Sequence, residues 1–286
     1  MTVSAGRPKA ASFAVRMRRD VIIARGADAR SFLHSQLSND IASLVVGASR
    51  YSFVLEPTGK LAALVRVRCE ADDIFVLDVD EGCGQSALAR LNKFKIRVKC
   101  EFELSTLIVT AVRGLDIASR EAVLAAPGAV AAWRAVDGAV DVFGDHNADG
   151  LAAVAGCAVR AAGTDEAERE RVRCAWPVFG VDIDGDCLPA ETSLVDVAVS
   201  FTKGCYPGQE LVERMDSRGA TAPRRLMRLP ARVAAADSGA ALAAAAREPY
   251  ELGGVVLGRC TSVAGDFALV MVTRAHLGAA EALASP

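Results

Sequence analysis

A single cysteine stands among small and polar residues in the segment KGCYPGQE, residues 203–210. Pro207 suits the first turn of a helix, because its missing N–H would have no partner there. We therefore predict that Cys205 lies at or just before the N-terminus of a helix that starts PGQELVERM. The unpaired amides of that terminus and the ammonium of Lys203 would both favour the thiolate over the thiol. The segment thus predicts a functional thiol, with a buried structural cysteine as the alternative.

The neighbours of this cysteine allow close backbone approach and hydrogen bonding. Gly204 and Gly208 have no side-chain bulk, so a ligand or partner could come close to the backbone. A tyrosine ring and a glutamine amide would lie near the sulfur. With Cys205 in the catalytic role, the residues predicted to bind a ligand or partner are Lys203, Gly204, Tyr206, Gly208, Gln209, Glu210 and Arg214.

The other seven cysteines favour packing over chemistry. They lie at positions 69, 83, 100, 157, 174, 187 and 260, and no two have the C-x-x-C spacing of a zinc knuckle or a redox pair. The DIDGD segment at 182–186 lacks the glycine and glutamate positions of an EF-hand, so we predict a polar turn and no metal site. The three histidines lie far apart, and a Cys205–His pair is left open because such partners meet only in the fold.

The net charge of −2 provides no global field that would recruit nucleic acid or an acidic membrane. A local charge of +5 does occur between residues 214 and 232. The arginines are Arg214, Arg218, Arg224, Arg225, Arg228 and Arg232, against the single acid Asp216. Such a stretch could hold an anionic ligand or an RNA phosphate, and a solvated strand face is the alternative.

The length of 286 residues predicts roughly two compact units. Apolar spacing predicts a helix over 29–44 with Asp28 as its cap, strands at 51–55 and 61–69 joined by the turn EPTGK, and a strand at 74–79. A helix at 81–94, a strand at 95–104, a strand at 106–112 and helices at 116–126, 150–159 and 165–173 follow. From Ala222 the segments 224–229, 253–263 and 266–273 are typical of short strands in a β-barrel or sandwich.

The octapeptide, with the helix after it, resembles the signature of the YgfZ-type folate-binding proteins. These are paralogues of the glycine-cleavage aminomethyltransferase (T-protein) and act in iron–sulfur cluster assembly or repair. Pro207 occupies the variable position of that signature. Weaker similarities are in FLHSQLSNDIASL, RYSFVLEPTGKLAALVRV, FGVDIDGDCLPAE and GGVVLGRCTSV.

The resemblance implies an α+β fold: a T-protein-like folate-binding body over residues 1–220 and a small C-terminal β-barrel domain over 221–286. It implies tetrahydrofolate or a folate derivative as cofactor, and iron–sulfur enzymes or cluster-assembly proteins as partners. The arginine-rich stretch would then meet a folate tail. A folate-dependent aminomethyl transferase is the alternative function, and a pure binding module with a structural Cys205 is a third.

Two departures from the aminomethyltransferases bear on enzymatic activity. Their aspartate in the strand after the glycine turn has no counterpart, because no carboxylate occurs between Lys60 and Cys69, and Ala62 and Ala63 stand about where it would fall. Their pterin-anchoring glutamate is replaced by Arg173. Because general acid–base catalysis needs a titratable group, aminomethyl transfer has little support, and whether the chain is an enzyme is left open.

The N-terminal 20 residues are basic and lack the apolar core of a signal peptide. No window elsewhere approaches the roughly 18 apolar residues of a membrane span. We therefore expect a soluble cytoplasmic protein that has no membrane partner and a flexible basic arm at its N-terminus.

Overall fold

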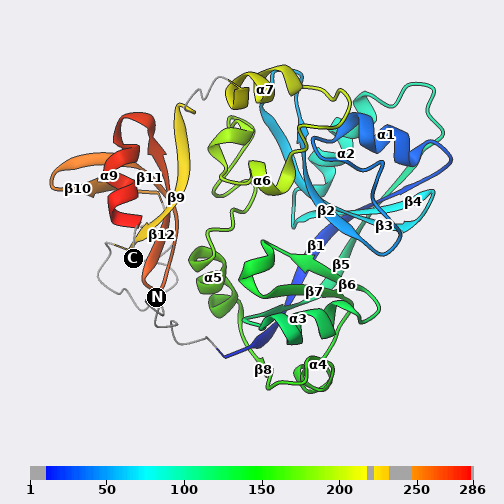
Figure 1. The fold of residues 1–286 in the computed structure, drawn as a ribbon, viewed down its shortest axis with the longest axis horizontal. Helices are drawn as coiled ribbons and strands as arrows, with labels where there is room; N and C mark the ends of the chain where they lie inside the picture. The colour runs from blue at the N-terminus through cyan, green and yellow to red at the C-terminus, as the bar shows by residue number, and fades with distance from the viewer. Residues whose placement is uncertain (1–10, 218–221, 232–246, 285–286) are drawn as a thin grey trace, which may run out of the picture. The chain divides into compact units, whose positions relative to one another are not determined.

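The computed structural model describes residues 11–217, 222–231 and 247–284 (Figure 1). Residues 1–10 of the predicted flexible basic arm lie outside these ranges. The prediction is wrong for residues 13–20, because they belong to strand β1 (Phe13–Arg25), which is paired with neighbouring strands. The chain forms two compact units: one comprises Met1–Arg18 and Leu107–Ala167, and the other comprises Arg19–Thr106 and Glu168–Pro286. No helix within the described ranges is long and apolar enough to span a membrane.

An antiparallel sheet organises the first part of the second unit. Strand β1 (Phe13–Arg25) pairs with β4 (Ile74–Asp80) from Arg19 onward, β4 pairs with β3 (Leu61–Ala71), and β3 pairs with β2 (Ser49–Leu55). Helices α1 (Ala29–Gln36) and α2 (Gly84–Lys93) bury apolar side chains with this sheet. The shared core includes Ile22, Leu33, Phe75, Leu77 and Leu91. Strand β3 and the turn before it follow the prediction.

The predicted helix over 29–44 is wrong in its second half, because α1 ends at Gln36. Leu37 is extended and forms a bridge with Val54, and the N–H of Ser38 donates to the carbonyl of Phe53. Tertiary pairing with β2 thus overrides the helical periodicity. Asp28 does not cap the helix with its side chain, which instead accepts the N–H of Lys99 at 2.8 Å.

The predicted strand over 95–104 is also wrong in its first half. Strand β5 runs from Glu101 to Arg113, and it continues through the position where two separate strands were expected. Arg97 has a left-handed backbone with φ of 57°, and the ammonium of Lys95 donates to the carbonyl of Cys100. These local contacts turn the chain before the strand can start.

The first unit has its own hydrophobic core. Strands β5, β7 (Ala139–Phe143) and β6 (Ala129–Ala132) pair antiparallel in that order, and β8 (Arg160–Ala161) pairs parallel with residues 13 and 14 of β1. Helices α3 (Ile117–Leu124) and α4 (Ala148–Ala155) cover a core that includes Val112, Val123, Val140 and Leu151. A 3₁₀ turn, η1 (Ala135–Asp137), connects β6 and β7.

Helix α4 lies two residues earlier than the predicted 150–159 and ends sooner. Asn147 caps it by accepting the N–H of Gly150 at 2.7 Å, and Gly156 ends it with φ of 64°. Helix α5 (Thr164–Arg173) begins one residue before its predicted start. The Asn147 side chain and the left-handed backbone of Gly156 therefore set the bounds of α4.

The remaining elements belong to the second unit. The turns and helices η2 (Pro189–Glu191), α6 (Val195–Ala198) and α7 (Gln209–Ser217) precede a second antiparallel sheet of order β10-β11-β12-β9. Its strands are β9 (Arg224–Pro230), β10 (Pro249–Leu252), β11 (Val255–Ala264) and β12 (Phe267–Thr273). The turn η3 (Arg274–His276) leads into α9 (Leu277–Ala284), which packs on this sheet (Figure 1). The predicted α+β architecture is confirmed.

A buried charge joins three parts of the second unit. The carboxylate of Asp182, whose residue is 1% exposed, accepts the guanidinium of Arg171 on α5 at 2.6 Å. It also accepts the hydroxyls of Thr261 and Ser262 on β11, both at 2.6 Å. The DIDGD segment at 182–186, predicted to be a polar turn, therefore begins with a buried carboxylate that has a structural role. This network fixes the approach to the cysteine segment against the C-terminal sheet.

Asp182→Ala should lower the free energy of unfolding by about 3 kcal/mol, because it removes the buried carboxylate that pairs with Arg171 and accepts the hydroxyls of Thr261 and Ser262, and leaves Arg171 with only the partly exposed Glu168. Asp186→Ala serves as the matched control. Asp186 has a side chain that is 80% exposed and pairs with Lys60 at the surface, so its loss should leave the unfolding midpoint nearly unchanged. Urea unfolding followed by circular dichroism measures both, and similar midpoints for the two variants would contradict the role given to Asp182.

Candidate functional site

Lys203 anchors the start of the cysteine segment to helix α1. Its ammonium donates to the carbonyls of His34 and Leu37 at the C-terminal end of that helix, and it lies 4.9 Å from the centre of the Tyr206 ring. Burial lowers the pKa of Lys203 to about 8, an effect partly offset by Asp40 and Cys205. The ammonium was predicted to favour the thiolate form of Cys205. In the structure it also satisfies two carbonyl groups at the C-terminal end of α1.

Gly208 anchors the other end of the segment. Its φ is 82°, and a Cβ there would lie 2.7 Å from the carbonyl oxygen of Glu56 and 2.9 Å from the Cα of Gly59. The backbone of the segment thus packs directly on the turn that joins β2 and β3. The expected close approach does occur at Gly208, but the chain's own turn makes it. Around Gly204, in contrast, a Cβ would meet no described atom within 4 Å.

Helix α7 starts at Gln209 and not at Pro207 as predicted. The left-handed backbone of Gly208 cannot belong to the helix, and residues 206–209 form a turn in which the N–H of Gln209 donates to the carbonyl of Tyr206. The Gln209 side chain accepts the N–H of Tyr206 at 3.3 Å and donates to Glu213 at 2.5 Å. Cys205 therefore lies four residues before the helix.

Cys205 is exposed, whereas the other seven cysteines, all in described parts of the chain, are buried or half-buried. Phe201, at 41% exposure, lies four residues before it on the same surface loop. The His34 ring accepts the N–H groups of Ile41 and Ala42. Within the described residues, no hydrogen bond joins a histidine to Cys205, and no cluster of metal-ligating side chains occurs.

A polar cavity of about 440 Å³ borders the segment. It is lined by Pro57, Thr58, Tyr206, Gly208, Gln209, Glu210, Leu211 and Arg214. The structure thus brings together five of the eight predicted site residues, while Cys205, Lys203 and Gly204 lie outside the lining. Sequence reasoning missed Thr58, which it treated only as part of a turn.

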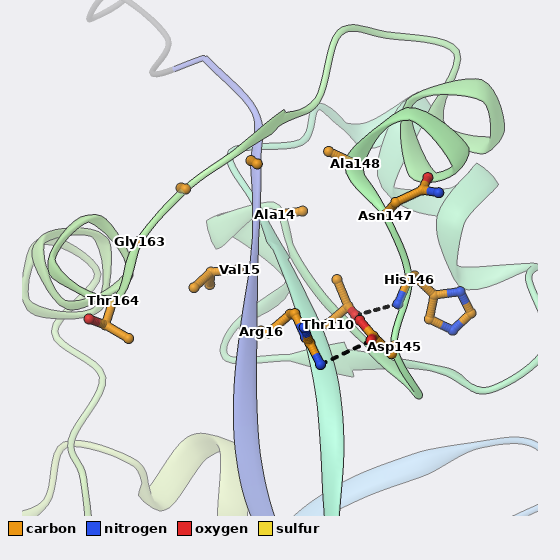
Figure 2. Close-up of a pocket in the computed structure, with 12 residues that line it drawn as sticks. Ala14, Val15, Arg16, Thr110, Asp145, His146, Asn147, Ala148, Gly163 and Thr164 are labelled. Atoms are coloured by element: carbon orange, nitrogen blue, oxygen red, sulfur yellow. Dashed lines mark hydrogen bonds and ion pairs between the residues drawn. The ribbon is translucent and has the colours of Figure 1, made fainter.

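Two further cavities contain none of the predicted residues. An apolar cavity of about 320 Å³ also borders α7 and is lined by Leu188, Pro189, Ala190, Val195, Phe201, Leu211, Val212, Met215 and Asp216. A cavity of about 620 Å³ lies in the first unit beside β1 and the start of α4 (Figure 2). There Arg16 pairs with Asp145 at 2.9 Å, and the N–H of His146 donates to the Thr110 hydroxyl (Figure 2).

Most described arginines of the positive stretch at 214–232 bond to other parts of the chain. Arg224 pairs with the buried Glu191 at 3.0 Å, and Arg225 pairs with Glu281. Arg228 donates to the carbonyl of Arg173 and lies over the Phe267 ring. Arg214 differs from these three because it is exposed and lines the polar cavity. Arg218 and Arg232 fall outside the described residues.

The structure shows where the residues lie that differ from the aminomethyltransferase pattern. Ala62 and Ala63 lie on β3, and Ala63 is buried. Arg173 donates to both carboxylate oxygens of Glu170, at 2.7 and 2.6 Å. Arg173 therefore forms an ion pair within its own helix, α5.

No family model matches the chain. An uncharacterized protein of Haemophilus influenzae is 26% identical over 213 residues, which cover 70% of this chain and 67% of that protein. The mitochondrial iron–sulfur cluster assembly factor IBA57 homolog of Mycosarcoma maydis is 26% identical over 222 residues, covering 72% of this chain but only 54% of that protein.

Among solved structures, the glycine cleavage system aminomethyltransferase T from Bartonella henselae is similar, with a TM-score of 0.70 at 19% identity. The similarity covers 93% of this chain and 80% of that one. The chain therefore has the fold of an aminomethyltransferase T-protein.

Gly208→Ala and Gly204→Ala form a matched pair that tests the backbone contact. Gly208→Ala should lower the free energy of unfolding by about 1–3 kcal/mol, because the new Cβ would collide with backbone at a left-handed residue. Gly204→Ala should change it by less than about 0.5 kcal/mol. Thermal unfolding measures both, and equal melting temperatures would show that the contact with the β2–β3 turn does not constrain the segment.

Proposed function

We propose that this chain is a tetrahydrofolate-binding accessory protein of iron–sulfur cluster assembly or repair, with Cys205 as its functional thiol. The observation that carries the proposal is the exposure of Cys205 on a segment held at both ends, at Lys203 and at Gly208. A purely structural cysteine would be expected to be buried, as the remaining cysteines largely are. The assembly-factor relative and the T-protein fold support this function.

The residues around the polar cavity are compatible with a folate. Cavities that bind small molecules usually have volumes of about 300–1,000 Å³, and this one is within that range. Tyr206 contributes to the lining, and its hydroxyl is buried without a partner among the described residues. Tyr206, Gln209 and Arg214 would hold part of the molecule. A bound tetrahydrofolate would supply a carrier for one-carbon units.

The thiol and the cavity have separate roles in this proposal. Cys205 does not line the cavity, although its neighbour Tyr206 does. Because the sulfur is exposed, a partner protein could reach it while the cavity is occupied. The side chain could therefore act on a docked iron–sulfur protein next to the bound cofactor.

An accessory role agrees with the chain better than aminomethyl transfer does. Such transfer would need a proton-transferring group beside the reactive folate nitrogen. The strand that would provide it carries Ala62 and Ala63, and the first carboxylate on β3 is Glu70, near the far end of the strand.

Cys205→Ser should remove function while leaving the fold unchanged. In a strain whose own copy of this gene has been deleted, the variant should leave the activities of iron–sulfur enzymes several-fold below those restored by the unaltered chain. Cys157→Ser is the control, since Cys157 is a half-buried cysteine of the first unit. Immunoblotting and circular dichroism check that both variants accumulate and fold. Full restoration by Cys205→Ser would refute the proposal for this thiol.

A further inference from the structure

The apolar cavity beside α7 differs in character from the polar one. Eight of its nine lining residues are apolar, and Asp216 is the single charged residue among the nine. Its volume of about 320 Å³ is at the lower end of the range of about 300–1,000 Å³ that is usual for small-molecule sites. The cavity therefore suits one or two apolar side chains better than a large polar cofactor.

The cavity lies next to the loop that carries the exposed thiol. Helix α7 provides Leu211 and Met215, and it packs against η2, which provides the facing side. Phe201 lines the cavity from the loop, four residues before Cys205, and is 41% exposed although it is a large aromatic residue. Aromatic and methionine side chains are enriched in the centres of protein–protein interfaces. These residues therefore fit a surface that a partner protein covers.

Asp216 gives the cavity a preference for positive charge. It is exposed and lies in the last turn of α7, which runs to Ser217. The partial negative charge at the C-terminal end of a helix disfavours a carboxylate there and favours a cation. Asp216 forms no ion pair with any described residue. Arg214 does not neutralise it, because side chains two positions apart on a helix do not face each other, and Arg214 lines the polar cavity.

We propose that this cavity docks an apolar side chain that has a lysine or arginine as its neighbour, on the protein that Cys205 acts on. The inference rests on the proposed function and deepens it, because it states the chemistry of the contact that the partner makes. The apolar side chain fills the cavity between η2 and α7, and the partner's cation pairs with Asp216. Contact with Phe201 then brings the partner's surface next to the thiol.

Two synthetic peptides with the same apolar centre test the chemistry: acetyl-Gly-Lys-Leu-Phe-Lys-Gly-amide, and its counterpart with glutamate in place of both lysines. Fluorescence anisotropy of the dye-labelled peptides with the full chain should show about fivefold tighter binding of the lysine peptide. Asp216→Asn should bring the two affinities together, because it removes the charge. Phe201→Ala should weaken both peptides about fivefold or more. Asp149→Asn, at an exposed acid of α4 in the first unit, is the control and should change neither affinity.

Three results of this titration would overturn the proposal. The first is no binding of the lysine peptide at millimolar concentration. The second is equal affinity of the unaltered chain for the two peptides. The third is a preference for the lysine peptide that persists in Asp216→Asn.

A second measurement links docking to the thiol and separates this proposal from the proposed function. In the deletion strain, Phe201→Ala should leave the activities of iron–sulfur enzymes several-fold below those restored by the unaltered chain, and iodoacetamide should alkylate its Cys205 at an unchanged rate. Full restoration by Phe201→Ala would overturn the docking role. Cys205→Ser should bind both peptides normally, because Cys205 does not line the cavity. If the function assigned to the thiol fails, the peptide titration therefore still decides whether the cavity docks such a segment.

Discussion

The direct packing of the Gly208 backbone on the β2–β3 turn is the constraint on which the site depends. It leaves no room for a side chain at Gly208, and it determines where the segment 203–210 meets the body of the second unit. The ammonium of Lys203 completes the attachment by bonding to the end of α1. Between these two points the chain must turn outward, and this brings Gly204 and Cys205 to the surface.

The segment therefore contains residues that hold the loop in place and one residue, Cys205, that the loop exposes. The sequence alone does not distinguish these two roles. Lys203, Gly208 and Gln209 build the loop, through contacts with α1, with the β2–β3 turn and with the backbone of Tyr206. Cys205 is left exposed by them. Most of the residue types in this short segment are therefore explained by the contacts that hold the loop and leave its thiol exposed. The buried network around Asp182 joins this residue to α5 and to β11.

Much of the fold could be predicted because strands such as β3 and β12 are short apolar runs that are buried along most of their length. The errors came where a contact between distant residues decided the outcome. Leu37 leaves the helix to pair with Val54, and the Asp28 carboxylate bonds to Lys99 and not to its own helix. Neither partner can be chosen from local sequence, because both lie outside any helical window.

The site was predictable to a similar degree. The segment KGCYPGQE contains the exposed cysteine and four of the eight residues that line the polar cavity. It could not show that Lys203 is bonded to α1, or that the approach at Gly208 is made by residues 56–60, because both partners lie some 150 residues earlier in the chain. The arginine stretch misled for the same reason, since Glu191 and Glu281 pair with Arg224 and Arg225 only after folding.

The central claim is that this framework presents one thiol out of eight to solvent. Native protein treated with a limiting amount of iodoacetamide, then digested and analysed by mass spectrometry, tests it most directly. The account predicts that Cys205 is alkylated first, well ahead of half-buried Cys83, Cys157 and Cys174. Modification of any of these three before Cys205 would contradict it.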